Sequence, residues 1–195
     1  PVHQRFEDAR AWFGSRMGWE RPNFFAPPGH APVIEYAWGK QNWIGWVDAE
    51  QRATREAVAL FDQTSFGKLL VTGPDAQEVL QWLCTANVAV PVGRTVYTGV
   101  LNERGTYEAD VTITRLAHDE YLWVTSAGSP ARDRDWILRH VARDQRVAVV
   151  DVSNALAVFG VMGPRSRELL QSLTRCDLSH ASFGFGTSRE IDLGY

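Results

Sequence analysis

The sequence has few of the residues that build metal sites, disulfide frameworks or membrane spans. Its two cysteines, Cys84 and Cys176, lack CxxC spacing, so each is expected to be a small buried side chain rather than a ligand or nucleophile. The five histidines are scattered without metal-ligand spacing, so no metal is expected. No apolar run is long enough to cross a bilayer, and the beginning of the chain is not a secretory signal. We therefore expect no membrane partner and a cytoplasmic protein, or one of the mitochondrial matrix if eukaryotic.

The chain also lacks an excess of positive charge. The net charge is -3 and the isoelectric point lies near 6.0, so no basic field favours a phosphate backbone and nucleic acid is not an expected partner. No GxGxxG motif follows a strand, so this chain by itself is not expected to bind a flavin dinucleotide. With 45% hydrophobic and 22% charged residues, the composition is that of an ordinary globular domain.

The chain has two regions of different character. Residues 1–50 hold five of the eight tryptophans and five of the nine prolines, with little helical or strand periodicity. We expect a linking segment that makes no core of its own and lays its aromatic side chains on another surface, of this chain or of a missing domain. Residues 51–195 form the second predicted domain. The absence of an initial methionine and the ending "EIDLGY" suggest a fragment.

The regular region contains an internal repeat. "KLLVTGPDAQEVLQWL" is an apolar strand, a Gly-Pro turn and an amphipathic helix, and "AVFGVMGPRSRELLQSL" repeats the pattern 90 residues later. Between the copies the pattern predicts a hairpin at about 96–115, a strand "EYLWVTSA", a helix opened by Ser129 and Pro130, and a strand "RVAVVDV". The order β-α-β-β-β-α-β-β-α indicates an α+β fold, a mainly antiparallel sheet with helices on one face and two related halves.

One carboxylate, Asp110, interrupts the strand "NERGTYEADVTITRL". Alternation places it on the polar face with Glu108, while Tyr107, Ala109 and Val111 lie on the other. A polar strand face often meets water, so this aspartate needs no function. A hairpin centred on residues 103–104 would instead set Tyr97 directly opposite Asp110, which would suit a flat, nitrogen-bearing ligand. A three-residue loop would shift that pairing, and Gly105 makes a bulge possible.

The helix after Ser129 alternates charges of both signs. This pattern predicts a solvated face with local ion pairs. The residues are Arg132, Asp133, Arg134, Asp135, Arg139, Arg143 and Asp144.

Several motifs together resemble a known family. "LFDQTSFGKLLVTGPDA", "VYTGVLNERGTYEADVTITRL" and "ALAVFGVMGP" are similar to the folate-binding aminomethyltransferase of glycine cleavage, the T-protein, over about residues 50–195. The preceding "FGSRMGWERPNFFAP" and "EYAWGKQNW" resemble the segment that joins the flavin and folate domains of sarcosine and dimethylglycine dehydrogenases. With that segment the resemblance covers nearly the whole chain.

The resemblance implies a set of site residues. Asp110 matches the aspartate that contacts tetrahydrofolate near the bridging nitrogen that attacks a methylene iminium, and it is the implied catalytic residue. Tyr97 and Phe66 match pocket residues, and Val124 and Ser126 lie on the strand that completes the pocket. For these four residues simple packing is the alternative reading. Ser126 stands where T-proteins commonly have asparagine, a departure from the family pattern.

The resemblance also implies a function. The chain would be part of a flavin-dependent sarcosine or dimethylglycine dehydrogenase, the part that binds tetrahydrofolate and forms methylenetetrahydrofolate from an iminium or formaldehyde. FAD would belong to the parent's separate flavin domain, the expected partner, and the substrate would be an N-methylated glycine. The alternatives are a stand-alone folate-dependent aminomethyltransferase or demethylase, and a non-catalytic folate-binding regulatory protein. A second acidic folate ligand of the family would follow Tyr195, so the 195 residues alone are expected to catalyse weakly or not at all.

Overall fold

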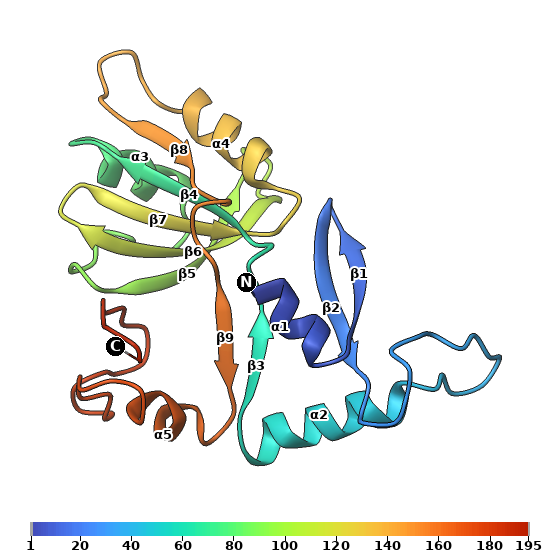
Figure 1. Cartoon of the computed structure of the whole chain (residues 1–195). Coiled ribbons are helices and arrows are strands. Elements are labelled where there is room, and N and C mark those ends of the chain that lie inside the picture. The colour runs from blue at the N-terminus through green and yellow to red at the C-terminus, as the bar shows by residue number, and fades with distance from the viewer. Residues whose placement is uncertain (1, 195) are drawn as a thin grey trace. The chain divides into compact units, whose positions relative to one another are not determined.

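The computed structural model describes residues 2–194 (Figure 1). The chain divides into two compact units, one formed by residues up to 63 together with 159–173, the other by residues 64–158 together with those from 174 on. The expected division between residues 50 and 51 falls inside helix α2 (Ile44–Glu56), and the unit that contains residues 2–50 also recruits a strand and a helix from the second repeat. In the described part of the chain, no helix is long and apolar enough to span a membrane.

The second unit contains a five-stranded sheet in which every strand pair is antiparallel. The strand order is β5-β6-β7-β4-β8, so neighbouring strands β4 and β7 are far apart in sequence. Two helices accompany the sheet. The elements are β4 (Gly67–Thr72), α3 (Ala76–Leu83), β5 (Thr95–Leu101), β6 (Tyr107–Ala117), β7 (Glu120–Thr125), α4 (Pro130–Arg139) and β8 (Ala148–Asp151).

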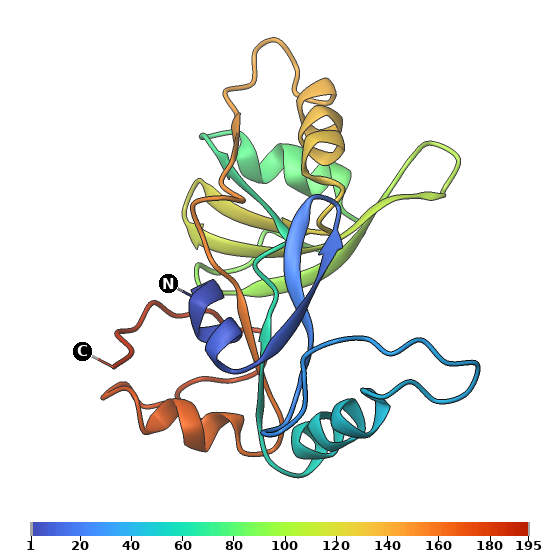
Figure 2. The same ribbon diagram turned by 45° about the vertical axis from the view of Figure 1, so that its right-hand side comes forward.

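Both helices of this unit cover the same face of the sheet (Figure 2). The apolar face of α3 is fully buried, as its periodicity predicts, and Ile137 of α4 joins the same core. The sheet contributes alternate residues such as Val71, Val111 and Trp123, each at most 1% exposed. The predicted α+β class, with a mainly antiparallel sheet and helices on one face, is thereby confirmed.

The internal repeat is present as two strand-turn-helix units. In the second copy, β9 (Phe159–Met162) leads into α5 (Ser166–Gln171) as β4 leads into α3, and the predicted order of nine elements from β4 to α5 is correct. Gly73 and Gly163 begin the two turns with φ of 129° and 130°, a conformation that glycine alone adopts easily. In both turns another backbone crosses closely, because a Cβ at Gly73 would lie 2.1 Å from the Arg146 carbonyl oxygen and one at Gly163 2.4 Å from that of Ala57.

The first unit consists of two small sheets and three helices. A hairpin joins β1 (Ala11–Arg16) to β2 (Trp19–Phe25), and β3 (Ala59–Asp62) pairs antiparallel with β9. Helix α1 (Val2–Asp8) precedes the hairpin, and α2 and α5 complete the unit. Residues 2–50 therefore have more regular structure than their sequence pattern predicts.

An aromatic cluster holds this hairpin to α2. Phe24 is only 2% exposed and its ring is nearly parallel to those of Trp12 and Trp43, with centroids 5.7 and 5.9 Å away. Trp46 packs against the same ring at 5.7 Å. The prediction that this segment makes no core of its own was wrong, because aromatic area brought together by a bulged hairpin suffices for a small one. Trp38, by contrast, is fully exposed.

Candidate functional site

The strand alternation of β6 is confirmed around Asp110. Ala109, Val111 and Ile113 are buried against the helices, while Asp110 is exposed on the opposite face. Helices α3 and α4 lie on the face of the buried residues (Figure 2). Asp110 is thus displayed on the side of the sheet where a ligand could reach it.

The predicted hairpin register is wrong. Asp110 is paired with Gly99, and Tyr97 is paired with Thr112, two residues away from the expected partner. The loop is organised by Asn102, whose side-chain oxygen accepts hydrogen bonds from the backbone N–H groups of residues 104 and 106. The ladder then shifts between Val100 and Leu101, so that the strand β6 contains one extra residue.

Tyr97 nevertheless reaches Asp110. Residues two apart on paired strands share a face and are diagonal neighbours, within reach of a long aromatic side chain. The Tyr97 hydroxyl donates a hydrogen bond of 2.7 Å to Oδ2 of Asp110. This hydrogen bond, together with the charge of Asp110, raises the pKa of Tyr97 above its ordinary value. Of the sequence-predicted site residues, these two are brought into direct contact.

A second tyrosine joins the pair, and the sequence did not indicate it. The bulge moves Tyr107 to the face of Asp110, whereas strict alternation had placed it with the core residues. Its ring covers Gly99, where a Cβ would lie only 2.7 Å from Tyr107 Cε1. Gly99 therefore gives the ring room beside Asp110. The signal in the sequence was Gly105, which marks a possible bulge, together with Gly99 in the partner strand.

These residues line an open hollow of about 420 Å³. The hollow lies beyond the end of β7. Strand β6 pairs with β7 only from Thr112 onward, so residues 107–111 of β6 have β5 as their neighbour on one side and no paired strand on the other. Tyr97 and Tyr107 are 70% and 71% exposed, which leaves their rings available to a ligand. The lining residues are Tyr97, Tyr107, Glu108, Ala109, Asp110, Thr125, Ser129 and Arg132.

The other three predicted site residues lie nearby but do not line this hollow. Val124 is half-buried and pairs with Thr112, so it shares the face of Asp110 one strand away. Phe66 immediately precedes β4 and is 37% exposed. Ser126 follows β7, is exposed, and its Oγ lies 2.6 Å from Oγ of Ser129. Their roles as ligand contacts stay predictions.

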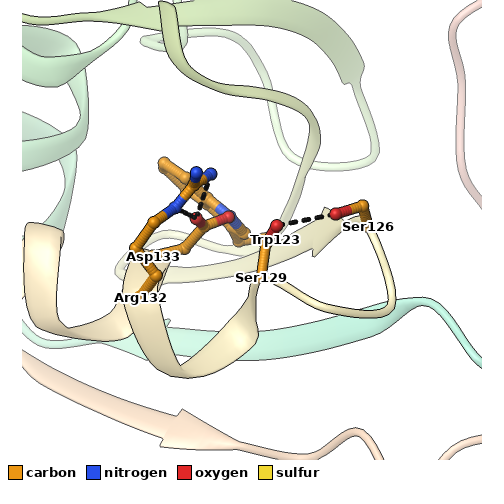
Figure 3. A network of polar contacts seen from close by, with 5 residues as sticks. All are labelled: Trp123, Ser126, Ser129, Arg132 and Asp133. Carbon is orange, nitrogen blue, oxygen red and sulfur yellow. Dashed lines mark hydrogen bonds and ion pairs between the residues drawn. The ribbon is translucent and has the colours of Figure 1, made fainter. Parts of the chain in front are cut away.

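Figure 3 shows a polar network at the beginning of α4. Two of its residues, Ser129 and Arg132, line the hollow. Asp133 is only 2% exposed. Its Oδ1 accepts hydrogen bonds from Nε and Nη2 of Arg132, at 3.3 and 3.1 Å. Its Oδ2 accepts a hydrogen bond of 3.3 Å from Nε1 of Trp123. The predicted solvated face is thus wrong for Asp133, although Asp135 and Arg139 do form an exposed ion pair at 2.7 Å. A buried carboxylate requires such partners, and the first turn of a helix also favours negative charge.

The sequence contained a signal for this burial. Asp133 lies three and four residues before Trp136 and Ile137, so it falls on the apolar stripe of α4. A charged residue on such a stripe needs a partner from another element, and Trp123 of β7 supplies it.

Cys84 is buried outside the hollow. Burial raises the pKa of Cys84 to about 12, so its thiol is a poor nucleophile. Among residues 2–194, no three His, Cys, Asp or Glu side chains gather as a metal site would require. The chemically useful groups of the hollow are therefore the carboxylate of Asp110, which is held by a phenol, the carboxylate of Glu108, two aromatic rings and one guanidinium.

Comparison with known proteins identifies the family of the chain. The family model described as the GCVT N-terminal domain matches residues 2–195. The chain belongs to this family. The 4-methylaminobutanoate oxidase (formaldehyde-forming) of Paenarthrobacter nicotinovorans is 40% identical over 99% of this chain and 23% of its own length. The mitochondrial sarcosine dehydrogenase of Homo sapiens is 32% identical over 97% of this chain and 25% of its own length.

Other relatives of similar identity include dimethylglycine dehydrogenases and a pyruvate dehydrogenase phosphatase regulatory subunit. The chain spans about a quarter of the length of these relatives. The crystal structure of glycine cleavage system aminomethyltransferase T from Bartonella henselae superimposes with a TM-score of 0.71 at 24% identity, over 88% of this chain and 42% of that one, which supports the fold. The chain is an aminomethyltransferase-like domain related to sarcosine and dimethylglycine dehydrogenases, as the sequence motifs indicated.

Proposed function

We propose that this chain is the part of a flavin-dependent N-demethylating dehydrogenase that binds tetrahydrofolate and receives the one-carbon unit. The observation that carries the proposal is the pair formed by Tyr97 and Asp110, with a 2.7 Å hydrogen bond, in an open hollow beside the ring of Tyr107. A carboxylate between two aromatic rings suits a flat ligand that carries a reacting nitrogen. Family membership supports tetrahydrofolate as that ligand.

Asp110 would act on the nitrogen of the folate. When this nitrogen attacks the carbon of a methylene iminium, a new carbon–nitrogen bond forms, the electrons of the iminium double bond return to the substrate nitrogen, and the attacking nitrogen becomes cationic. A carboxylate beside it stabilises that charge and can then accept the proton that the nitrogen loses. Tyr97 would hold the carboxylate in place through Oδ2 and leave Oδ1 to face the folate.

The remaining predicted residues would complete the pocket from the neighbouring strands. Val124 offers an apolar surface on the same sheet face as Asp110, and Phe66 lies at the start of β4, which pairs with the strand of Val124. Ser126 would act indirectly, because its hydroxyl is already bonded to Ser129. In this proposal residues 51–195 form the folate-binding domain and residues 1–50 link it to a flavin domain, where FAD would bind.

The substrate would be a small N-methylated amino acid, since the named substrates of the similar oxidase and dehydrogenases, 4-methylaminobutanoate, sarcosine and dimethylglycine, share a methylated amine and a carboxylate. Oxidation at the flavin would supply the iminium, or formaldehyde after its hydrolysis. A cytoplasmic location, or the mitochondrial matrix in a eukaryote, fits the mitochondrial relatives.

The test replaces Asp110 with asparagine in the full-length protein that carries this chain. Asparagine keeps the shape and still accepts the hydrogen bond of Tyr97, so tetrahydrofolate should bind with a Kd within about twofold to threefold of wild type. Formation of methylenetetrahydrofolate should slow by about 10² to 10³, the usual loss when one electrostatic group is removed from a reacting centre. The two quantities are measured by isothermal titration and by single-turnover kinetics.

Asp119→Asn is the matched control. Asp119 is an exposed aspartate in the turn between β6 and β7, and its exchange should change neither quantity. Equal rates for wild type and Asp110→Asn would remove the catalytic role of Asp110. Folate binding without any one-carbon capture by the wild type would favour a regulatory folate-binding protein instead.

A further inference from the structure

We infer that Arg132 is an anion-binding residue of the Asp110 hollow and receives the carboxylates at the far end of the folate. This inference rests on the proposed function, because it names how the same ligand is oriented there. It concerns a residue that neither the sequence motifs nor the family resemblance singled out.

The guanidinium of Arg132 is held in place by Asp133. Two of its nitrogens, Nε and Nη2, donate to the same carboxylate oxygen at 3.3 and 3.1 Å. Asp133 is itself fixed, because it is 2% exposed and its second oxygen accepts a hydrogen bond from Trp123, which is completely buried. A long arginine side chain usually loses rotamer freedom when it binds a ligand, and this anchoring removes part of that entropy before binding.

The guanidinium of Arg132 has further N–H groups that can donate to a ligand. A guanidinium carries five N–H groups, and the two contacts to Asp133 do not involve Nη1. The side chain of Arg132 is 58% exposed and lines the hollow. Guanidinium groups match the geometry of carboxylates, so a carboxylate is the natural ligand.

The charges of the hollow are separated by sign. Glu108 and Asp110 come from β6, and Arg132, from α4, is the one basic residue among the lining residues. Oε1 of Glu108 accepts a hydrogen bond from the side chain of Asn102 at 2.8 Å, which ties this acid to the hairpin loop. A ligand with an amine at one end and carboxylates at the other therefore fits in one orientation, with its amine at Asp110 and its anion at Arg132. Folate has this polarity, since its pterin and bridging nitrogen are followed by a glutamate tail.

The test compares two ligands in the full-length protein. One is tetrahydrofolate, and the other is its glutamate diamide, which has the same size but no negative charge. Arg132→Gln should raise the Kd of tetrahydrofolate about tenfold, equivalent to the loss of one charge-assisted hydrogen bond, and change the Kd of the diamide less than twofold. Added salt should weaken tetrahydrofolate binding more in wild type than in the variant.

Two further variants distinguish a loss of ligand binding at Arg132 from a disturbance of the fold. Arg139→Gln removes an arginine of the same helix that pairs with Asp135, outside the hollow, and should alter neither Kd. Arg132→Gln leaves buried Asp133 with one partner fewer, so the double variant Arg132→Gln/Asp133→Asn, which buries no unpaired charge, should show the same loss for tetrahydrofolate.

The outcomes distinguish this inference from the proposed function. If wild type binds tetrahydrofolate and Arg132→Gln binds it equally well, or loses both ligands equally, the carboxylate site is refuted while the proposed function stands. If the wild type binds neither ligand, the proposed function fails and the inference fails with it.

Discussion

Replacing Gly73 with alanine should destabilise the unit that contains the five-stranded sheet by about 2–5 kcal/mol. Its φ of 129° belongs to a region that residues with a side chain enter at a cost of about 1–3 kcal/mol. The added Cβ would also lie 2.1 Å from the Arg146 carbonyl oxygen, and overpacking of this kind costs about 1–3 kcal/mol. Alanine also restricts the unfolded chain, which offsets about 0.4–1 kcal/mol.

The backbone at Arg146 cannot easily move away from the new methyl group. Its N–H donates a hydrogen bond of 2.7 Å to Oδ2 of Asp75, and its guanidinium lies 3.6 Å from the same oxygen. On the other side, the N–H of Gly73 donates to the carbonyl of Asp119 at 2.9 Å. The backbone segments at Gly73 and Arg146 are therefore both held in place. Moving either one away from the new methyl group would break one of these hydrogen bonds.

The assay is urea unfolding followed by tryptophan fluorescence, since Trp123 is completely buried in this unit. With a dependence of about 1–3 kcal/mol per molar urea, the midpoint should fall by about 0.7–5 M. Gly105→Ala is the matched control, because its φ of 73° is also positive but no atom lies within 4 Å of the new Cβ. It should cost about 1–2 kcal/mol, from the backbone conformation alone. A Gly73 variant no less stable than the Gly105 variant would refute the close crossing of Arg146.

Three further predictions concern single side chains. The hydrogen bond to Asp110 raises the pKa of Tyr97, so the stabilisation by this bond is fully present below the ordinary tyrosine pKa and is lost as the pH rises through the raised pKa. In an ultraviolet titration, Asp110→Asn should therefore shift the ionisation of one tyrosine to lower pH. An unchanged titration curve would contradict the contact. Burial raises the pKa of Cys84 to about 12, so a thiol reagent at pH 8 should modify it only after denaturation, and rapid reaction in the native protein would show that it is accessible. Trp123→Phe removes a donor from buried Asp133 and should cost about 1–3 kcal/mol in urea unfolding, whereas an unchanged midpoint would mean that the hydrogen bond contributes nothing.

The order of elements and the orientation of Asp110 could be predicted from the sequence. Side chains alternate along a strand and recur every three to four positions along a helix, so the pattern of apolar residues shows which face is buried. The stripe of α3 and the alternation from Ala109 to Ile113 are both present as expected. The two Gly-Pro turns were also recognisable, because only glycine tolerates their backbone conformation.

The aromatic segment and the charged helix were predicted less well. Phe24 has no periodic apolar neighbours in sequence, and its burial depends on Trp12, Trp43 and Trp46 being brought to it by a hairpin and a helix. Asp133 looked like a solvated charge because its neighbours in sequence are charged. Its partner Trp123 lies on another element, and no local pattern indicates such a pairing.

The sequence by itself determined that a carboxylate would stand on the face of an antiparallel sheet opposite the core residues Ala109 and Val111, because side-chain direction along a strand is a property of the backbone. The tertiary structure decided what surrounds that carboxylate. The three-residue loop and one extra residue in β6 together moved the register by two positions at Tyr97, and the extra residue turned Tyr107 toward Asp110. The hydrogen bond of Asp133 in α4 to Trp123 of β7 fixes the beginning of α4, from which Arg132 lines the same hollow. Register and packing depend on contacts between distant segments, and these exist only once the chain has folded.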